Sequence, residues 1–373
     1  MAYEIDTLPL EALIGPALRA TAALARLDER LARSPLRDGW IERQHFADAA
    51  AALWLEGELV HVEDLVLHDA HMDIRTPTHE LTRAHGVLRA RRQIFAQKAD
   101  WALSAEGFRH LTRRSIVAEP AAALAGPEAG REAEIRSGAG GDAVPDELDR
   151  ALAAIDSVLE RTANVLEGGK ALPRAEMPAP QDRPSLVYDL DWDEDARLNE
   201  WQGVMAKTRP LPVALRAAIL IEAWSQIGVL QHGAFLGPLL VAALLRQEGL
   251  AAHHLASLHL GAKQIPRERR HARNGADRLV AMLDAVHQAA NLGLKEHDRL
   301  LLAKSQMERR LRDRRTSSRL PDLVELVLSR PLVSSGMVQQ ALKVSKQGAL
   351  NLIGELGLRE MTGRGRFRAW GVI

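Results

Sequence analysis

The chain has 373 residues, with 49 basic and 49 acidic side chains and no cysteine. The lack of cysteine excludes disulfides, thiolate metal sites and cysteine nucleophiles. Hydrophobic residues make up 46% and aromatic residues 4% of the chain, which excludes wholesale disorder and favours helices over a β-rich fold.

The sequence shows no targeting or membrane segment. The first ten residues lack the basic-then-apolar pattern of a secretory signal. The longest uncharged apolar stretch, Gly233–Leu245, has 13 residues, whereas a membrane span needs about 20. We therefore expect a cytoplasmic protein with no membrane partner.

Charge is unevenly distributed along the chain. Residues Val117–Glu200 hold 19 acids and 8 bases, whereas Gln306–Ile373 hold 13 bases and 6 acids, a balance of +7. A basic C-terminal module indicates an anionic partner such as nucleic acid. The alternative is that the two regions simply attract each other or form solvated faces.

The first third of the chain carries apolar residues at helical spacing. We predict helices over Glu11–Leu31, Arg43–Trp54 and Leu81–Leu103. Residues Ala118–Pro145 are rich in Ala, Gly, Pro and Glu and cannot bury enough surface to order themselves. The pattern predicts an N-terminal helical domain over 1–117 and a flexible linker over 118–145.

A second helical block follows the predicted linker. Helices are predicted over Asp146–Leu166, Leu211–Val229, Pro238–Gln247 and Ala276–Ala290. We assign these to a helical core over 146–314, followed by a separate C-terminal unit over 315–373. The expected fold class is mainly α.

The C-terminal unit has the pattern of a winged helix-turn-helix. Helices are predicted over Pro321–Ser329, Gly336–Leu342 and Lys346–Leu356, with Ser334 or Ser335 and then Ser345 as N-caps and Gly357 as the stop signal. Val338, Ala341 and Leu342 are expected to pack on the third helix, with the small Ala341 allowing a close crossing. Alternating polarity on both sides of Thr-Gly-Arg-Gly predicts a β-hairpin wing.

The polar residues of this unit occur where DNA contacts are needed. A recognition helix reads base edges with its first turns, and Gln and Asn can pair bidentately with adenine. Arginines in a wing can reach phosphates or a minor groove. The predicted contacts to double-stranded DNA are Ser345, Lys346, Gln347, Asn351, Arg364, Arg366 and Arg368. The alternative is a helical hairpin with a β-ribbon used for protein contacts.

These residues carry a family resemblance. Pro321–Ile373 resembles the winged helix-turn-helix domains of bacterial regulators, and LKVSKQGALNLIGELGLREMTGRGRFRAW is similar to the DNA-binding tail of many Fic-domain proteins. Upstream, Phe46–Leu67 and Pro210–Leu250 resemble the segment before a Fic core and its paired core helices. The resemblance implies a Fic-like helical body in front of the DNA-binding domain.

The catalytic loop of Fic enzymes is not preserved. Their His-x-Phe-x-Asp/Glu-Gly-Asn-Gly-Arg motif supplies a base, a metal-holding acid and phosphate-binding groups. Here the chain reads His232-Gly-Ala-Phe235-Leu236-Gly237-Pro238, with no acid, Asn or phosphate-side Arg. Without groups that stabilise transferred charge, the resemblance implies the fold and argues against AMP transfer. The whole chain resembles an uncharacterised bacterial family in which a degenerate Fic-like region precedes a helix-turn-helix.

We therefore expect a DNA-binding transcriptional regulator that associates with the nucleoid and forms a homodimer, with a catalytically degenerate Fic-like body that serves dimerisation or senses a signal. No catalytic residue, cofactor or metal site is predicted, although Asp64, His68 and His71 share a helical face that could hold a metal. Two alternatives stay open: an AMP transferase with a rebuilt loop around His232, and an antitoxin-like platform for protein contacts.

Overall fold

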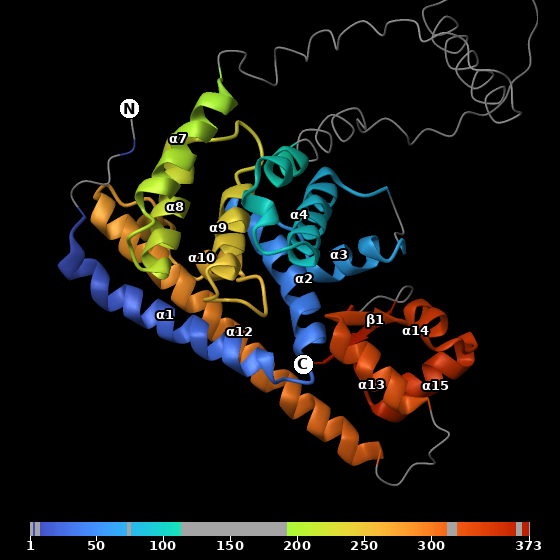
Figure 1. Ribbon diagram of the computed structural model, residues 1–373. Coiled ribbons are helices and arrows are strands. Elements are labelled where there is room, and N and C mark those ends of the chain that lie inside the picture. Colours follow the sequence, from blue (N-terminus) through green and yellow to red (C-terminus); the bar gives the residue numbers. More distant parts are fainter. Residues whose placement is uncertain are drawn as a thin grey trace, which may run out of the picture. The chain divides into compact units, whose positions relative to one another are not determined.

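The computed structural model describes residues 3, 8–72, 76–112, 192–311, 319–362 and 368–372. These residues form a helical body and a small C-terminal domain, and they belong to one compact unit (Figure 1). The mainly α fold class with a winged helix-turn-helix is confirmed. The domain boundaries predicted near residues 117, 145 and 314 fall outside the described part, so they stay predictions.

The helical body is built from segments that lie far apart in the sequence. Helix α1 lies along α12 (Figure 1), and α2 packs on α4 and α10. The described helices of the body are α1 (Leu10–Ala32), α2 (Arg37–Leu55), α3 (Val62–Asp69), α4 (His79–Ala96), α7 (Glu194–Lys207), α8 (Val213–Ile227), α9 (Leu236–Gln247), α10 (Leu258–Lys263), α11 (Arg267–Arg270) and α12 (Gly275–Leu311), with a 3-10 turn η1 (Trp101–Leu103).

Helix α12 is much longer than the predicted segment Ala276–Ala290. The sequence Asn291-Leu-Gly-Leu has the appearance of a helix stop, but the helix continues through Gly293 because that residue lies at a crossing. A Cβ added to Gly293 would lie 2.7 Å from a Leu27 methyl carbon and 2.9 Å from the Trp40 ring. The indole Nε1 of Trp40 donates to the Gly293 carbonyl over 2.9 Å, so α1, α2 and α12 meet at this point.

A buried polar network joins α2, α4 and α10. Asp48 on α2 is fully buried, pairs with the equally buried Arg91 of α4 and accepts from the Leu260 amide over 2.8 Å. Its second oxygen lies 2.9 Å from His259 Nδ1. Burial by itself would raise the pKa of Asp48, but Arg91 and His259 together hold it below its usual range. The carboxylate is therefore charged and ties three helices together.

In the described residues of the C-terminal domain there are three helices and a three-stranded sheet. Strand β3 lies in the middle and pairs antiparallel with β1 and with β2. Its elements are α13 (Leu320–Ser329), β1 (Leu332–Ser334), α14 (Ser335–Leu342), α15 (Lys346–Leu356), β2 (Arg359–Glu360) and β3 (Ala369–Gly371). In the described part of the chain no helix is both long and apolar enough to cross a bilayer.

Candidate nucleic-acid interface

The turn between α14 and α15 is closed by backbone geometry and a cap. Lys343 adopts a left-handed conformation (φ 54°, ψ 45°) directly after α14. Ser345 then caps α15, its Oγ accepting from the Gly348 amide over 3.1 Å. Such a cap satisfies one of the free amide groups at the start of a helix. The predicted turn and N-cap are confirmed, and the first turn of α15 is anchored.

The apolar contacts under this turn differ in one respect from the prediction. Val338 and Leu342 of α14 are buried, as are Ala349 and Ile353 of α15. Ala341, which we expected at the crossing, is exposed. The buried residues that α14 contributes are therefore Met337, Val338 and Leu342, and not Ala341.

The predicted base-reading residues lie together on the exposed side of α15. Ser345, Lys346, Gln347 and Asn351 are all exposed. Gln347 Nε2 donates to Asn351 Oδ1 over 2.9 Å, which leaves the Gln347 oxygen and the Asn351 nitrogen for an outside partner. One acceptor and one donor side by side are what the major-groove edge of adenine requires. Lys346 has no ion-pair partner among the described residues, so its charge is available to a phosphate.

Arg368 of the wing already pairs with a carboxylate of the same domain. Arg368 donates from Nε to Glu360 Oε2 over 2.7 Å and stacks over Trp370, 5.4 Å from the ring centroid. The Glu360 hydrogen bond raises the pKa of Arg368. Contact with a phosphate would have to compete with Glu360. The predicted contacts Arg364 and Arg366 lie outside the described residues.

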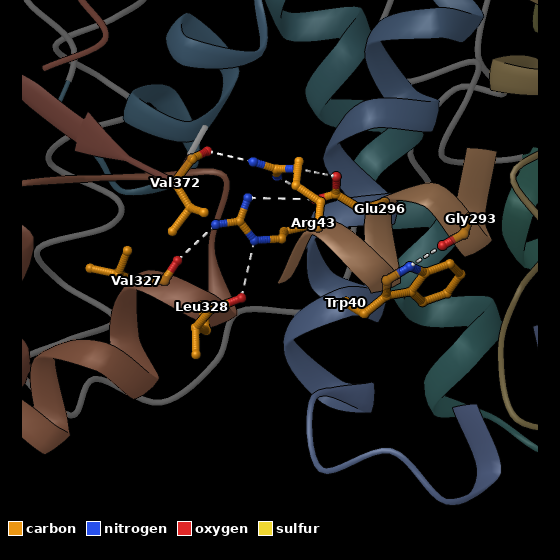
Figure 2. A network of polar contacts seen from close by, with 8 residues as sticks. Trp40, Arg43, Gly293, Glu296, Val327, Leu328 and Val372 are labelled. Atoms are coloured by element: carbon orange, nitrogen blue, oxygen red, sulfur yellow. Dashed lines mark hydrogen bonds and ion pairs between the residues drawn. The ribbon is translucent and has the colours of Figure 1, made fainter. Parts of the chain in front are cut away.

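Two arginines that our prediction missed are among the side chains that attach the winged domain to the body (Figure 2). Arg43 of α2 donates to the carbonyls of Val327 (2.8 Å) and Leu328 (3.1 Å), in the last turn of α13. Arg299 of α12 donates to the Val372 carbonyl over 2.7 Å, just after β3. The last carbonyls of a helix have no partner inside it, so Arg43 satisfies groups that would otherwise be buried without hydrogen bonds.

Arg43 and Arg299 share one carboxylate. Arg299 forms two hydrogen bonds to Glu296, of 2.7 and 2.6 Å, and a guanidinium nitrogen of Arg43 lies 3.8 Å from the same carboxylate. Burial lowers the pKa of Arg43 to about 10, Glu296 opposes this shift and Arg299 adds to it. Arg43 is therefore charged at neutral pH. A sequence signal existed, since Arg43-Gln44-His45 is a polar run inside an Ala-rich amphipathic helix.

The side of the winged domain that meets the body differs from the side that carries the predicted DNA contacts. The body reaches the end of α13 through Arg43 and the C-terminal end of α15 through Arg310, which donates to the Leu356 carbonyl over 2.6 Å. The N-terminal turns of α15 remain exposed with the body in place. We call this packing of the winged domain on the body the seated arrangement. It leaves the candidate recognition surface exposed.

Comparison with known proteins agrees with this geometry. Residues 320–373 match the model described as an HTH DNA binding domain, and residues 186–312 match that of a protein of unknown function, DUF1612. The uncharacterized protein y4cF of Sinorhizobium fredii is 51% identical over 382 aligned residues, covering 100% of both chains. The chain belongs to the y4cF family. The predicted resemblance to a helix-turn-helix family of unknown function is confirmed.

A structural comparison also finds a Fic family protein. The crystal structure of a Fic family protein from Desulfovibrio desulfuricans G20 covers 100% of this chain and 98% of its own, with a TM-score of 0.43 and 11% identity. At this level of similarity, the match does not bear on what the body of this y4cF-family protein does.

The loop around His232 connects α8 and α9. The Gln231 amide donates to Glu194 over 3.3 Å, and the Phe235 carbonyl lies 3.1 Å from His259 Nε2. His259 in turn contacts the buried Asp48. In the y4cF-family body, the polar side chains bonded to this loop therefore help to hold the helices together.

The residues considered as an alternative metal site do not share one helical face, because α3 ends at Asp69 and His71 lies beyond it with a left-handed backbone (φ 54°). Asp69, which directly follows His68, forms an ion pair with Arg92 (2.7 Å) and lies 3.2 Å from His85 Nε2. The rings of His68 and His85 meet edge to face at 4.8 Å. Within the described ranges, no three His, Asp or Glu side chains are grouped so that they could hold a metal ion.

Proposed function

We propose that this protein is a sequence-specific DNA-binding transcriptional regulator of the bacterial cytoplasm that associates with the nucleoid. The observation that carries the proposal is the exposed Gln347–Asn351 amide pair on the first turns of a capped helix, in a region that matches a DNA-binding family model. The helical body serves as a platform that positions the winged domain.

In this proposal the exposed residues have separate roles. Gln347 and Asn351 read a base edge, and a well-placed bidentate contact of this kind contributes about 1–3 kcal/mol of discrimination. Lys346 contacts phosphate, which adds affinity without sequence preference. In the wing, Arg364 and Arg366 contact phosphate or the minor groove. Arg368 also contacts DNA after it releases Glu360.

The test is selection of bound duplexes from fragmented genomic DNA, followed by titration over a salt series. We expect Gln347→Ala to relax the selected sequence while leaving affinity for random DNA nearly unchanged. Lys346→Ala and Arg364→Ala should weaken binding to all duplexes, each reducing the salt slope by about 1. Matched controls in the body are Gln247→Ala and Lys207→Ala, which replace exposed side chains of the same kind and should change neither property.

Two results would contradict the proposal. If Gln347→Ala selects the same sequences as the unmodified protein, α15 is not the reading helix. If binding to all duplexes is as strong at high salt as at low salt, the interface is not electrostatic and Lys346 has no phosphate role.

We further propose that the protein binds DNA as a homodimer. Helix-turn-helix dimers bind two half-sites about 10–10.5 base pairs apart, and two linked contacts add affinity. Light scattering during gel filtration should give twice the 41.0 kDa chain mass, and the selected sites should be palindromic. A monomer on a single asymmetric site would refute dimeric binding without affecting the assignment of α15.

A further inference from the structure

A cavity lies where the winged domain meets the body. Its volume is about 590 Å³, within the range of about 300–1,000 Å³ that is typical of small-molecule sites. The winged domain lines it with Pro331, Leu332, Met361 and Val372, and the body lines it with helices α2, α3, α10 and α12. Both parts of the protein are therefore needed to form it.

Most of the cavity wall is apolar. Ala47, Val62, Leu260 and Leu292 line it from the body side, and four apolar residues line it from the winged domain. This wall suits a ligand with a hydrocarbon or aromatic body, whose transfer from water is favourable.

Three of the charged residues at the wall already have ion-pair or hydrogen-bond partners within the protein. Arg43 and Arg299 line the cavity together with Glu296, and each arginine pairs with Glu296 and donates to carbonyls of the winged domain (Figure 2). This trio carries a net charge of +1, and its hydrogen bonds hold the winged domain in place. It gives the cavity a fixed positive field.

Two further charged residues line the cavity without a partner in the part of the chain that the structure describes. Lys295 and Glu63 are both at the wall, and neither takes part in an ion pair or hydrogen bond with any other described residue. Lys295 lies next to Glu296 on α12, and Glu63 lies in the first turn of α3. Counting all five charged residues, the wall has a net charge of +1, which favours an anion.

We infer that this junction cavity binds a small organic acid, in which a carboxylate pairs with Lys295 and an apolar body packs between Leu292 and Leu332. Glu63 would accept a hydrogen bond from a hydroxyl or amino group where the acid carries one. This site goes beyond the proposed DNA binding and does not depend on it.

The location of the site makes its ligand a candidate effector. A ligand that contacts both α12 and β1 binds the seated arrangement and loses half of its contacts when the winged domain moves away. Such a ligand shifts the equilibrium toward the seated arrangement by as much as its affinities for the two arrangements differ.

The site is tested by titrating the full-length protein with sodium octanoate and measuring the heat of binding by isothermal titration calorimetry. Octylammonium chloride is the charge-reversed probe of the same chain length. We expect saturable binding of one octanoate per chain and at least tenfold weaker binding of octylammonium. Lys295→Gln should weaken octanoate binding at least tenfold, whereas Lys207→Gln, at a lysine that is exposed like Lys295 but lies on α7 and does not line the cavity, should leave it unchanged.

A second variant addresses the cavity itself. Ala47→Leu adds three carbon atoms at the wall and should weaken octanoate binding in a protein that melts like the unmodified one. Absence of octanoate binding, equal binding of octylammonium, or full binding by Lys295→Gln overturns the proposal. Many octanoates per chain, insensitive to both variants, would show general adsorption and also overturn it. Should Ala47→Leu fail to fold, Lys295→Gln with its control decides the question.

Discussion

In the winged domain, the serine caps of two helices join residues three positions apart, whereas two hydrogen bonds that hold the body together join residues more than a hundred positions apart. Ser334 and Ser345 each cap a helix through the amide three residues on. In the body, the guanidinium of Arg91 donates to the Leu255 carbonyl, and Trp40 donates to Gly293. Damage to the winged domain should therefore stay local, whereas damage to the body should spread.

The largest effect is expected from Asp48→Asn. This change removes the negative charge opposite the fully buried Arg91, and an unpaired buried charge typically costs 3–5 kcal/mol. Urea unfolding followed by circular dichroism should show a loss of about that size. Because Asp48 joins α2, α4 and α10, amide protection should fall in all three helices.

The control for this change lies on the same helix. Asp38 of α2 has a side chain that is 89% exposed, and Asp38→Asn should alter stability by no more than about 0.5 kcal/mol. Similar losses for the two variants would mean that the buried pair is not what holds the body together.

A somewhat smaller effect is expected where α10 crosses α12. A Cβ on Gly261 would lie 2.1 Å from the Ala285 carbonyl oxygen and 2.8 Å from Ala289. Gly261→Ala should therefore force the helices apart and destabilise the body by about 1–3 kcal/mol, although Ala is the better helix former. Thermal melting of the purified variant measures the effect.

Gly203 on α7 provides the matched control. A Cβ there has nothing within 4 Å among the described residues, so Gly203→Ala should stabilise the protein by roughly 0.5–1 kcal/mol. Opposite signs for the two variants would confirm that the effect comes from the crossing and not from helix propensity. Stabilisation by Gly261→Ala would show that the crossing is looser than described.

The sequence predicted the winged domain better than the body. The difference in the range of their contacts along the chain explains why. Helices α13, α14 and α15, both serine caps and the turn at Lys343 follow from residues that are close in the chain. Strand β1 was missed because three residues after a proline carry little pattern, and their strand conformation depends on pairing with residues 369–371.

In the body, helices were predictable but their polar contacts were not. Asp48 and Arg91 have the sequence appearance of solvent-facing residues, and only their meeting across 43 positions makes them buried. The same holds for the candidate sites. Gln347 and Asn351 were found from helix position, whereas the pairing of Arg368 with Glu360 and the role of Arg43 required the folded chain.

Acid should weaken the body through its buried histidines. Burial lowers the pKa of His45 and of His254, although nearby Asp48 and Asp28 respectively oppose the shift. Both rings are thus neutral when folded, and the unfolded chain takes up protons first, near the ordinary value of 6.5. Stability should therefore fall as the pH drops below about 6.5.

Urea midpoints between pH 7.5 and 5 measure this dependence. His254→Gln should reduce the slope with pH, whereas His79→Gln, at an exposed position, should leave it unchanged. An equally steep dependence in both variants would place the titrating groups elsewhere.

The smallest effect is expected from the cap of α15. Ser345→Ala leaves the Gly348 amide without its acceptor and should cost about 1 kcal/mol, and Thr at this position should restore most of it. Ser335→Ala is the control, because the Ser335 hydroxyl has no partner in the described part of the chain. This change should reduce the free energy of unfolding by less than about 0.5 kcal/mol.

Hydrogen exchange distinguishes a local from a global loss in this variant. If the contrast between the regions holds, Ser345→Ala should speed exchange at the start of α15 and leave protection in α2 and α12 unchanged. If protection falls in the body as well, Arg43 and Arg299 couple the two regions so tightly that they unfold together. The winged domain would then owe its order to long-range contacts after all, and its caps would be consequences of seating on the body.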